Sequence, residues 1–133
     1  MKRLIGAVVA VFVALQVLDF LIHMVLLKNQ YAVSSQLWRP EAEMKMVLMT
    51  LVSLLFVVCF VLIYDLYFKY KCVKSGIIYG LILGIGIGAN MGYGTYSVMP
   101  IPYMVALGWF LGVVVELTVA GLITGLIMRE EKN

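Results

Sequence analysis

The sequence predicts an all-α integral membrane protein, with four transmembrane helices arranged as an up-down bundle. The composition is the first observation: 64% of the 133 residues are hydrophobic and only 13% are charged. The mean hydropathy is +1.06, whereas a soluble domain is about half apolar and about a quarter charged. Four apolar runs are long enough to cross a bilayer, which takes roughly 20 residues. No linker or internal repeat divides the chain, so residues 1–133 are predicted to form a single domain.

The predicted spans cover residues 4–27, 46–64, 76–97 and 103–128. The first follows the residues "MKR" and therefore also resembles a secretory signal peptide. A signal peptide has an apolar region of about 7–15 residues before a small-x-small cleavage site. Here the apolar run continues to Leu27, and nothing after Leu15 resembles such a site. We therefore expect this segment to be a retained membrane span.

The connection between the first two spans is the largest loop, and two interpretations of it stay open. Pro40 suits the first turn of a helix, where its missing N–H costs nothing. Glutamates after it would lie near the positive end of the helix dipole. The second helix is therefore predicted to begin near Pro40. The loop serves either as a cap over the bundle, with interfacial aromatic residues, or as a docking surface for a partner that includes Tyr31, Trp38, Arg39, Glu41 and Glu43.

The third span is rich in glycine, and the spacing indicates what the glycines do. A dinucleotide-binding loop needs a strand before it and a helix after it, and a membrane span leaves no room for the strand. Small residues four apart instead form one ridge of a helix, where another backbone can approach closely. The sequence predicts helix packing at Gly76, Gly80, Gly84, Gly88 and Gly92.

The fourth span carries a second small-residue ridge. A stiff Pro-Ile-Pro turn joins it to the third span, so the two helices are predicted to lie in close antiparallel contact. The same pattern would also serve homo-oligomerisation. The ridge comprises Gly108, Gly112, Glu116, Ala120 and Thr124, with Gly121 and Gly125 as a second small pair.

The basic residues predict the orientation. Lys28, Arg39 and Lys45 fall on one side of the predicted membrane and the remaining seven on the other. The positive-inside rule then places both termini in the cytoplasm, and we expect a bacterial inner-membrane protein. The net charge of +3 is modest, so no nucleic-acid partner is predicted. The seven are Lys2, Arg3, Lys69, Lys71, Lys74, Arg129 and Lys132.

Three ionisable residues inside the spans require an explanation. Inserting a charged side chain at the centre of a membrane helix costs about 2.5–3.5 kcal/mol even on translocon scales. The three residues are Asp19, His23 and Glu116, accompanied by the uncharged Gln16 and Asn90. On a helix, Gln16, Asp19 and His23 fall within about 60° of one another. Helical rise places Asp19, His23 and Asn90 in the outer leaflet, and Gln16 and Glu116 near the midplane. Tilt could bring Asp19 and Glu116 together, although nothing in the sequence requires it.

Two roles are compatible with these polar residues. They could hydrogen-bond to one another and fix which helices meet, at about 0.6 kcal/mol per bond. They could also carry protons or cations, as membrane carboxylates and histidines often do. Asp19 and His23 are weak candidates for metal ligands, because a closed site normally needs about four. No cofactor is predicted, and Cys59 and Cys72 form no metal or redox motif.

Three functions follow, of which the first is slightly favoured. The protein is a structural or accessory subunit that packs against itself or a larger membrane complex. Alternatively, it is a small proton- or cation-coupled transporter or channel that uses Asp19, His23 and Glu116. The third reading is a membrane-embedded enzyme acting on a lipid or quinone through His23, Asp19 and Arg39. No motif of a soluble-type enzyme is present, so enzymatic activity is not favoured.

Overall fold

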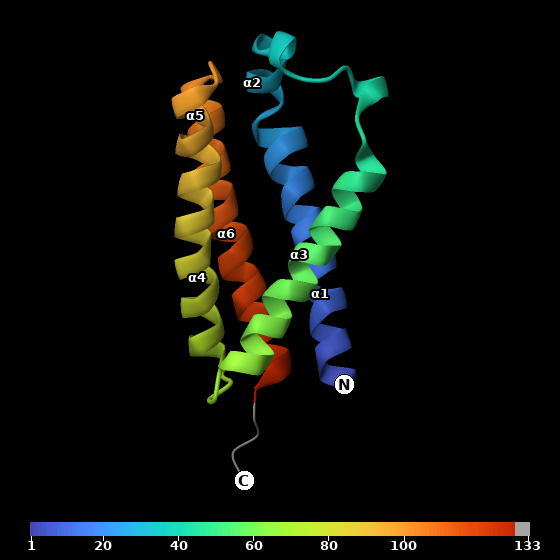
Figure 1. Cartoon of the computed structure of the whole chain (residues 1–133), viewed down its shortest axis with the longest axis vertical. Coiled ribbons are helices and arrows are strands. Elements are labelled where there is room, and N and C mark those ends of the chain that lie inside the picture. Colours follow the sequence, from blue (N-terminus) through green and yellow to red (C-terminus); the bar gives the residue numbers. More distant parts are fainter. Residues whose placement is uncertain (130–133) are drawn as a thin grey trace.

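The computed structural model describes residues 1–129, and all of their regular structure is helical. Four helices in this part of the chain are long and apolar enough to cross a membrane, which confirms that prediction (Figure 1). The last predicted basic residue, Lys132, lies outside the described residues. The four helical segments are Lys2–Leu26, Met46–Tyr67, Val73–Val98 and Tyr103–Met128.

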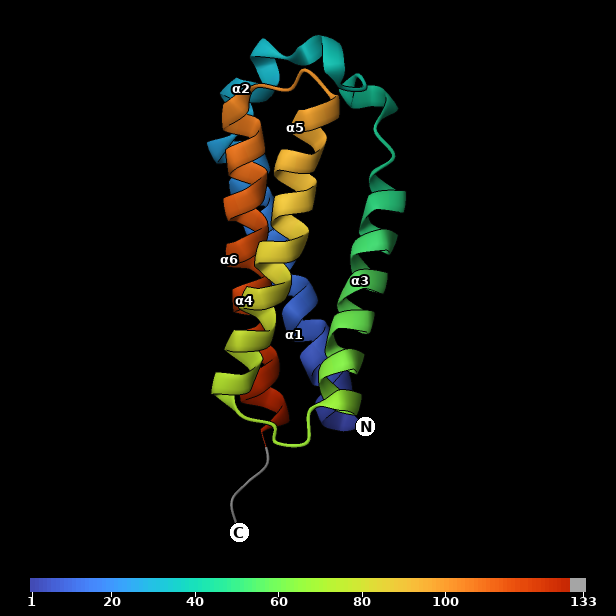
Figure 2. The same ribbon diagram turned by 60° about the vertical axis from the view of Figure 1, so that its left-hand side comes forward.

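The four segments run alternately up and down the long axis of the molecule (Figures 1 and 2). The N-terminus, the loop after α3 and the end of α6 lie together at one end, here called the N-terminal end. The opposite end carries α2 and is called the α2 end. The first segment, called the first span, consists of α1 (Lys2–Asp19) and the π-helix η1 (Phe20–Leu26). The other elements are α2 (Lys28–Val33), α3 (Met46–Tyr67), α4 (Val73–Ala89), the π-helix η4 (Asn90–Gly94), α5 (Thr95–Val98) and α6 (Tyr103–Met128).

The second long helix does not begin near Pro40, as the sequence predicted, but at Met46. Pro40 has φ −51° and ψ 144°, and only a single 3₁₀ turn, Glu41–Glu43, follows it. All residues from 39 to 52 are exposed. Short helices in water depend on packing of an apolar face, and residues 39–45 bury no such face. The proline and glutamate signals therefore produce one turn and no more.

Glycines of α4 lie where this helix meets α6. A Cβ atom built at Gly88 would lie 2.8 Å from the carbonyl oxygen of Phe110. At Gly76 and Gly80 of α4, and at Gly92 of η4, it would lie closer still to a carbonyl oxygen of α6. Cβ atoms essentially never come within 3.0 Å of such an atom. A larger residue at these positions would therefore force the two backbones apart.

The face that α6 turns toward α4 is not the ridge that the sequence predicted. Gly121 and Gly125 do lie against α4, next to Gly76 and Cys72. The Gly108 position instead faces the side chain of Leu27. Because the α4 glycines already remove the side chains that would hold the helices apart, α6 needs no small residue opposite each of them.

The other half of the predicted ridge faces the first span. A Cβ at Gly112 would lie 3.2 Å from the side chain of Ile22. Gly108 and Gly112 thus make room for η1 instead of for α4. Glu116 lies one helical turn further along the same ridge of α6. This change of partner brings Glu116 toward the first span.

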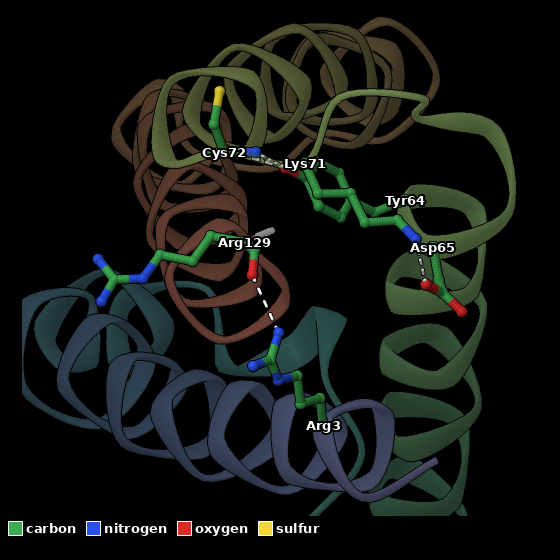
Figure 3. A network of polar contacts seen from close by, with 6 residues as sticks. All are labelled: Arg3, Tyr64, Asp65, Lys71, Cys72 and Arg129. Atoms are coloured by element: carbon green, nitrogen blue, oxygen red, sulfur yellow. Dashed lines mark hydrogen bonds and ion pairs between the residues drawn. The ribbon is translucent and has the colours of Figure 1, made fainter. Parts of the chain in front are cut away.

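Hydrogen bonds from tyrosines connect α3 to the start of α4 at the N-terminal end. The Tyr64 hydroxyl donates to the Cys72 carbonyl oxygen at 2.9 Å (Figure 3). It also lies 2.7 Å from Ser75 Oγ. Further in, the Tyr79 hydroxyl donates to the carbonyl of Phe60 at 2.9 Å. Tyr64 and Tyr79 are both buried. The lower half of α3 is therefore attached to α4 by polar as well as apolar contacts.

Two further contacts link elements at this end. Lys71 Nζ lies 2.7 Å from Asp65 Oδ1, and an Arg3 guanidinium N–H donates to the carbonyl of Arg129 at 3.2 Å (Figure 3). The first links the end of α3 to the following loop, and the second links the first span to the end of α6.

The main apolar core fills the half of the bundle toward the N-terminal end. The first span, α3, α4 and α6 all contribute to it, and its exposed fractions do not exceed 8%. By contrast, residues 46–52 of α3 are all exposed, and this half of the helix leans away from the others (Figures 1 and 2). The buried core residues are Ala7, Val11, Leu15, Val57, Phe60, Val61, Tyr64, Tyr79, Leu117, Ala120 and Met128.

Candidate functional site

A cavity of about 150 Å³ lies between the first span and α6, with one residue of η4 at its edge. It brings together the three ionisable residues that the sequence singled out, Asp19, His23 and Glu116. The other lining residues are Ile22, Met91, Gly108, Trp109, Gly112 and Val113. At about 30 Å³ per water molecule, the cavity has room for several waters but not for a drug-sized ligand.

The two carboxyl groups reach the cavity from different helices. Asp19 ends α1, and Glu116 lies near the middle of α6. Since Gly108 and Gly112 let the first span approach α6, Glu116 and Asp19 line the same cavity. Glu116, which was expected in a separate polar layer near the midplane, therefore belongs to one cluster with Asp19 and His23.

His23 lies in a π-helix, a form in which each N–H bonds to the carbonyl five residues earlier. The Leu27 N–H, for example, donates to the carbonyl of Ile22 at 2.9 Å, five residues back along the chain. Such segments are rare and are frequently found at functional sites. Here the π-helix begins directly after Asp19 and contains His23. Both side chains are directed to the same cavity.

The imidazole of His23 and the carboxylate of Asp19 are near each other without direct hydrogen bonding. Nε2 of His23 lies 3.8 Å from Oδ1 of Asp19. A hydrogen bond between these atoms would be about 2.7–3.2 Å long. The side chains are 31% and 42% exposed, so neither is sealed in the core. A water molecule in the cavity, or a small rotation of either side chain, would complete the connection.

On its other side, His23 is hydrogen-bonded to Tyr31 of α2, and this tyrosine also accepts from Trp109 of α6. The Trp109 indole N–H donates to the Tyr31 hydroxyl oxygen at 2.7 Å. Indole can only donate, and the Tyr31 hydroxyl keeps a proton of its own that it can donate to Nδ1 of His23. In that arrangement, neutral His23 carries its proton on Nε2, the nitrogen that faces Asp19. The hydrogen bond from Trp109 favours this tautomer because it occupies one acceptor site of the Tyr31 oxygen.

The surroundings of Tyr31 keep its hydroxyl protonated. Burial raises the pKa of the Tyr31 phenol above its usual 10.0, and this outweighs the hydrogen bond from Trp109, which lowers it. The ring stacks on His23 with centroids 5.9 Å apart and meets Trp38 edge-on at 5.3 Å. At neutral pH, Tyr31 is therefore a neutral group that both accepts and donates.

Glu116 lies at the inner end of the series of polar groups formed by Tyr31, His23 and Asp19. Its Oε1 atom is buried and has no hydrogen-bond partner among the described residues. Buried polar atoms nearly always have a partner, and leaving one without a partner costs about 1–3 kcal/mol. Water in the cavity, or a proton shared with Asp19, would satisfy Oε1. The fold thus maintains a polar group at a position where packing alone would favour an apolar one.

The remaining predicted residues lie outside this cluster. Gln16 is half-buried on α1 and does not line the cavity, and Asn90 is exposed on η4. Among residues 1–129, no group of three or more His, Cys, Asp or Glu side chains is placed to hold a metal ion.

The loop residues predicted as a docking surface divide into two groups. Tyr31 and Trp38 are half-buried and pack against Ile101 and Val105, whereas Arg39, Glu41 and Glu43 are exposed. Arg39 lines a different groove and not the cavity of Asp19 and His23. The trio His23, Asp19 and Arg39 of the enzyme hypothesis is therefore not assembled in one pocket.

The sequence did not point to Trp109 as a member of the site. Tyr31 was predicted only as a docking residue, and its hydrogen bond from Trp109 was not foreseen. Trp109 and Glu116 are seven residues apart and hence lie on one face of α6. That spacing could have indicated that Trp109 lies on the same face of α6 as Glu116. The link from Tyr31 to His23 depends on how the chain turns at Leu27, which no periodicity predicts.

Comparison of this chain with family models, with curated proteins and with solved structures gave no significant match.

Proposed function

We propose that this protein is a small proton-coupled transporter in which Glu116 binds and releases a proton within the membrane. The observation that carries the proposal is the buried Oε1 of Glu116, without a partner among the described residues, beside a chain of titratable groups. The chain runs from Glu116 through Asp19 and His23 to Tyr31, near the α2 end. Intramembrane carboxylates and histidines in such an order are typical proton relays.

The proposed proton transfer passes through these groups in order, from Tyr31 to Glu116. A proton arriving at Tyr31 from the α2 end passes to Nδ1 of His23 as the Tyr31 hydroxyl gives up its own proton and takes the new one. His23 then releases the proton on Nε2 toward Asp19. Since 3.8 Å separates Nε2 from Oδ1 of Asp19, this step uses a water molecule or a side-chain rotation. Asp19 and Glu116 finally share the proton, because two adjacent carboxylates do not both readily carry charge.

The core on the other side of Glu116 supports a gated carrier over an open channel. Leu117 and Ala120 follow Glu116 on α6 and belong to the buried apolar core. Phe60 and Tyr79 close the same region from α3 and α4. Among residues 1–129, the polar groups that line a cavity with Glu116 lead toward the α2 end. Release toward the N-terminal end requires the helices to move.

The orientation of the protein in the membrane is part of the proposal. Within the described part of the chain, Lys2, Arg3 and Arg129 lie at the N-terminal end with the basic residues of the loop after α3. The positive-inside rule makes this end cytoplasmic. In a bacterial inner membrane, the α2 end and the opening of the relay would then face outward.

A proton-jump experiment on a solid-supported membrane tests the proposal without knowledge of the cargo. Proteoliposomes of the intact protein are exposed to a sudden drop in external pH, and the charge displacement is recorded. We expect a transient current that Glu116→Gln abolishes and that Asn90→Ala, outside the cavity, leaves unchanged. A transient of the same size in Glu116→Gln would overturn the proposal. A sustained current would contradict the gated mechanism.

A structural or accessory role remains the second candidate, and α3 favours it. Its residues 46–52 are exposed and form an apolar surface that no other helix in the described part of the chain covers. This part of α3 lies apart from the other helices (Figure 2). A second copy of this chain or a larger membrane complex would cover this surface. The native mass after gentle extraction tests the idea. A complex containing other chains, or a stable homo-oligomer, supports it, whereas a lone monomer contradicts it.

A further inference from the structure

A groove at the α2 end combines two cations with a methionine-rich wall. Its volume is about 400 Å³, and it lies where the chain enters α3. It is separate from the cavity around Glu116, with which it shares no lining residue. The lining residues are Arg39, Met44, Lys45, Met46, Leu48 and Met49.

The two cations of the groove have no ion-pair partner in the described part of the chain. Arg39 and Lys45 flank the 3₁₀ turn that carries Glu41 and Glu43. These glutamates are exposed but do not line the groove. The groove itself therefore presents two positive charges and no negative one. Its charge is complementary to a phosphate group, which arginine binds with two parallel hydrogen bonds and lysine as a point charge.

The rest of the groove is apolar and continues along a membrane-spanning helix. Met44, Met46 and Met49 supply flexible thioether side chains, which adapt to irregular hydrocarbon shapes. Below them, Val47, Leu51 and other side chains of α3 remain exposed, with Val47 at 76%. The cations thus lie at the end of a long apolar surface, in the order of a lipid headgroup and its acyl chain.

We propose that this groove binds an anionic phospholipid. The phosphate lies between Arg39 and Lys45, and one acyl chain runs along the exposed face of α3 toward the middle of the membrane. A lipid fits better than a soluble anion, because the methionine side chains make favourable contacts with an acyl chain but not with a free phosphate. It also fits better than a protein segment, since the charged part and the apolar part follow one another along α3 in the order of a headgroup and an acyl chain.

Native mass spectrometry of the intact protein from mixed micelles tests this binding. The micelles contain equal amounts of phosphatidylglycerol and phosphatidylcholine, and the readout is the ratio of the two lipids bound to the protein. A basic residue near a membrane surface contributes about fivefold to binding of an anionic lipid, so the double variant Arg39→Gln/Lys45→Gln should lower the preference roughly 30-fold. Lys28→Gln, which removes another cation from the same end but not from the groove, is the matched control.

Each outcome decides the proposal. A preference for phosphatidylglycerol that falls in the double variant and persists in Lys28→Gln supports it. A preference that is absent in the parent protein, unchanged in the double variant, or equally reduced by Lys28→Gln overturns it. Thermal unfolding of each variant in the same micelles shows that the fold is intact. Because residues 39–45 are exposed, we expect no change in unfolding temperature.

Discussion

The hydroxyl of Tyr31 lies between the imidazole of His23 and the indole N–H of Trp109, a residue 78 positions further along the chain than Tyr31. The indole can only donate, which fixes the direction of the hydrogen bond between Trp109 and Tyr31. When the Tyr31 hydroxyl in turn donates to Nδ1 of His23, the Nε2–H of the neutral histidine faces Asp19. A proton relay needs such an order, since each group must accept on one side and donate on the other.

The first prediction concerns the hydroxyl of Tyr31. Tyr31→Phe keeps the ring stacked on His23 but leaves the Trp109 N–H and His23 Nδ1 without their shared partner. We expect a loss of about 1 kcal/mol in the free energy of unfolding and a slower proton-jump transient. Tyr103→Phe is the control, because it removes a tyrosine–tyrosine hydrogen bond at the same end outside the cavity. Equal effects of the two variants on the transient would contradict the relay.

A second prediction separates a functional Glu116 from a structural one. Glu116→Leu removes the buried oxygen that lacks a partner, and its apolar side chain suits the neighbouring core. If Glu116 serves proton transfer, the variant should unfold at a higher temperature, with a gain of roughly 1–3 kcal/mol, and should lose the proton-jump transient. If Glu116 instead holds the helices together, the same variant should be destabilised. Thermal unfolding in detergent distinguishes these two results.

The third prediction compares two glycines of one helix. A Cβ at Gly80 would collide with the backbone of Leu117, whereas at Gly86 it would meet nothing within 4 Å. Gly80→Ala should therefore destabilise the protein by about 1–3 kcal/mol, the usual cost of overpacking. Gly86→Ala should be neutral or stabilise by up to about 1 kcal/mol through helix propensity. Chemical or thermal unfolding of the two variants, side by side, gives the answer. Equal stabilities would mean that α4 and α6 are not in close contact.

The fourth prediction is a pH dependence at the N-terminal end. Hydrogen bonds from Ser75 lower the pKa of the exposed Cys72 thiol below its usual 9.0. A lowered pKa means that the reactive thiolate persists to lower pH, and Ser75→Ala should shift the alkylation profile of Cys72 to higher pH. The rate of reaction with iodoacetamide is measured in a Cys59→Ser background, where Cys72 is the one remaining cysteine. An identical profile with and without Ser75 would contradict this role of the hydrogen bonds.

Composition and apolar run length predicted the helical class and the four long helices, because both properties are set by the bilayer. The end of the fourth span at Met128 agrees with the structure to the residue. The start of α3 was predicted less well. Pro40 and its glutamates are valid local signals, but a helical turn without a packing partner does not continue.

The sequence also identified Asp19, His23 and Glu116, since charges within a span are costly wherever they point. It could not tell that they share a cavity, because this depends on which neighbour each face of α6 meets. Gly112 was assigned to the contact with the third span and in fact faces Ile22. Periodicity locates a face of a helix, but the choice of its partner is a property of the whole bundle.

The central claim is that Glu116 exchanges a proton inside the membrane, and infrared spectroscopy observes that proton most directly. Difference spectra of the reconstituted protein between high and low pH report the C=O stretch of protonated carboxylic acids. The account predicts a band that appears as the pH falls, disappears in Glu116→Gln and remains in Asn90→Ala. A spectrum without such a band, or one in which Glu116→Gln leaves the band unchanged, would contradict the claim.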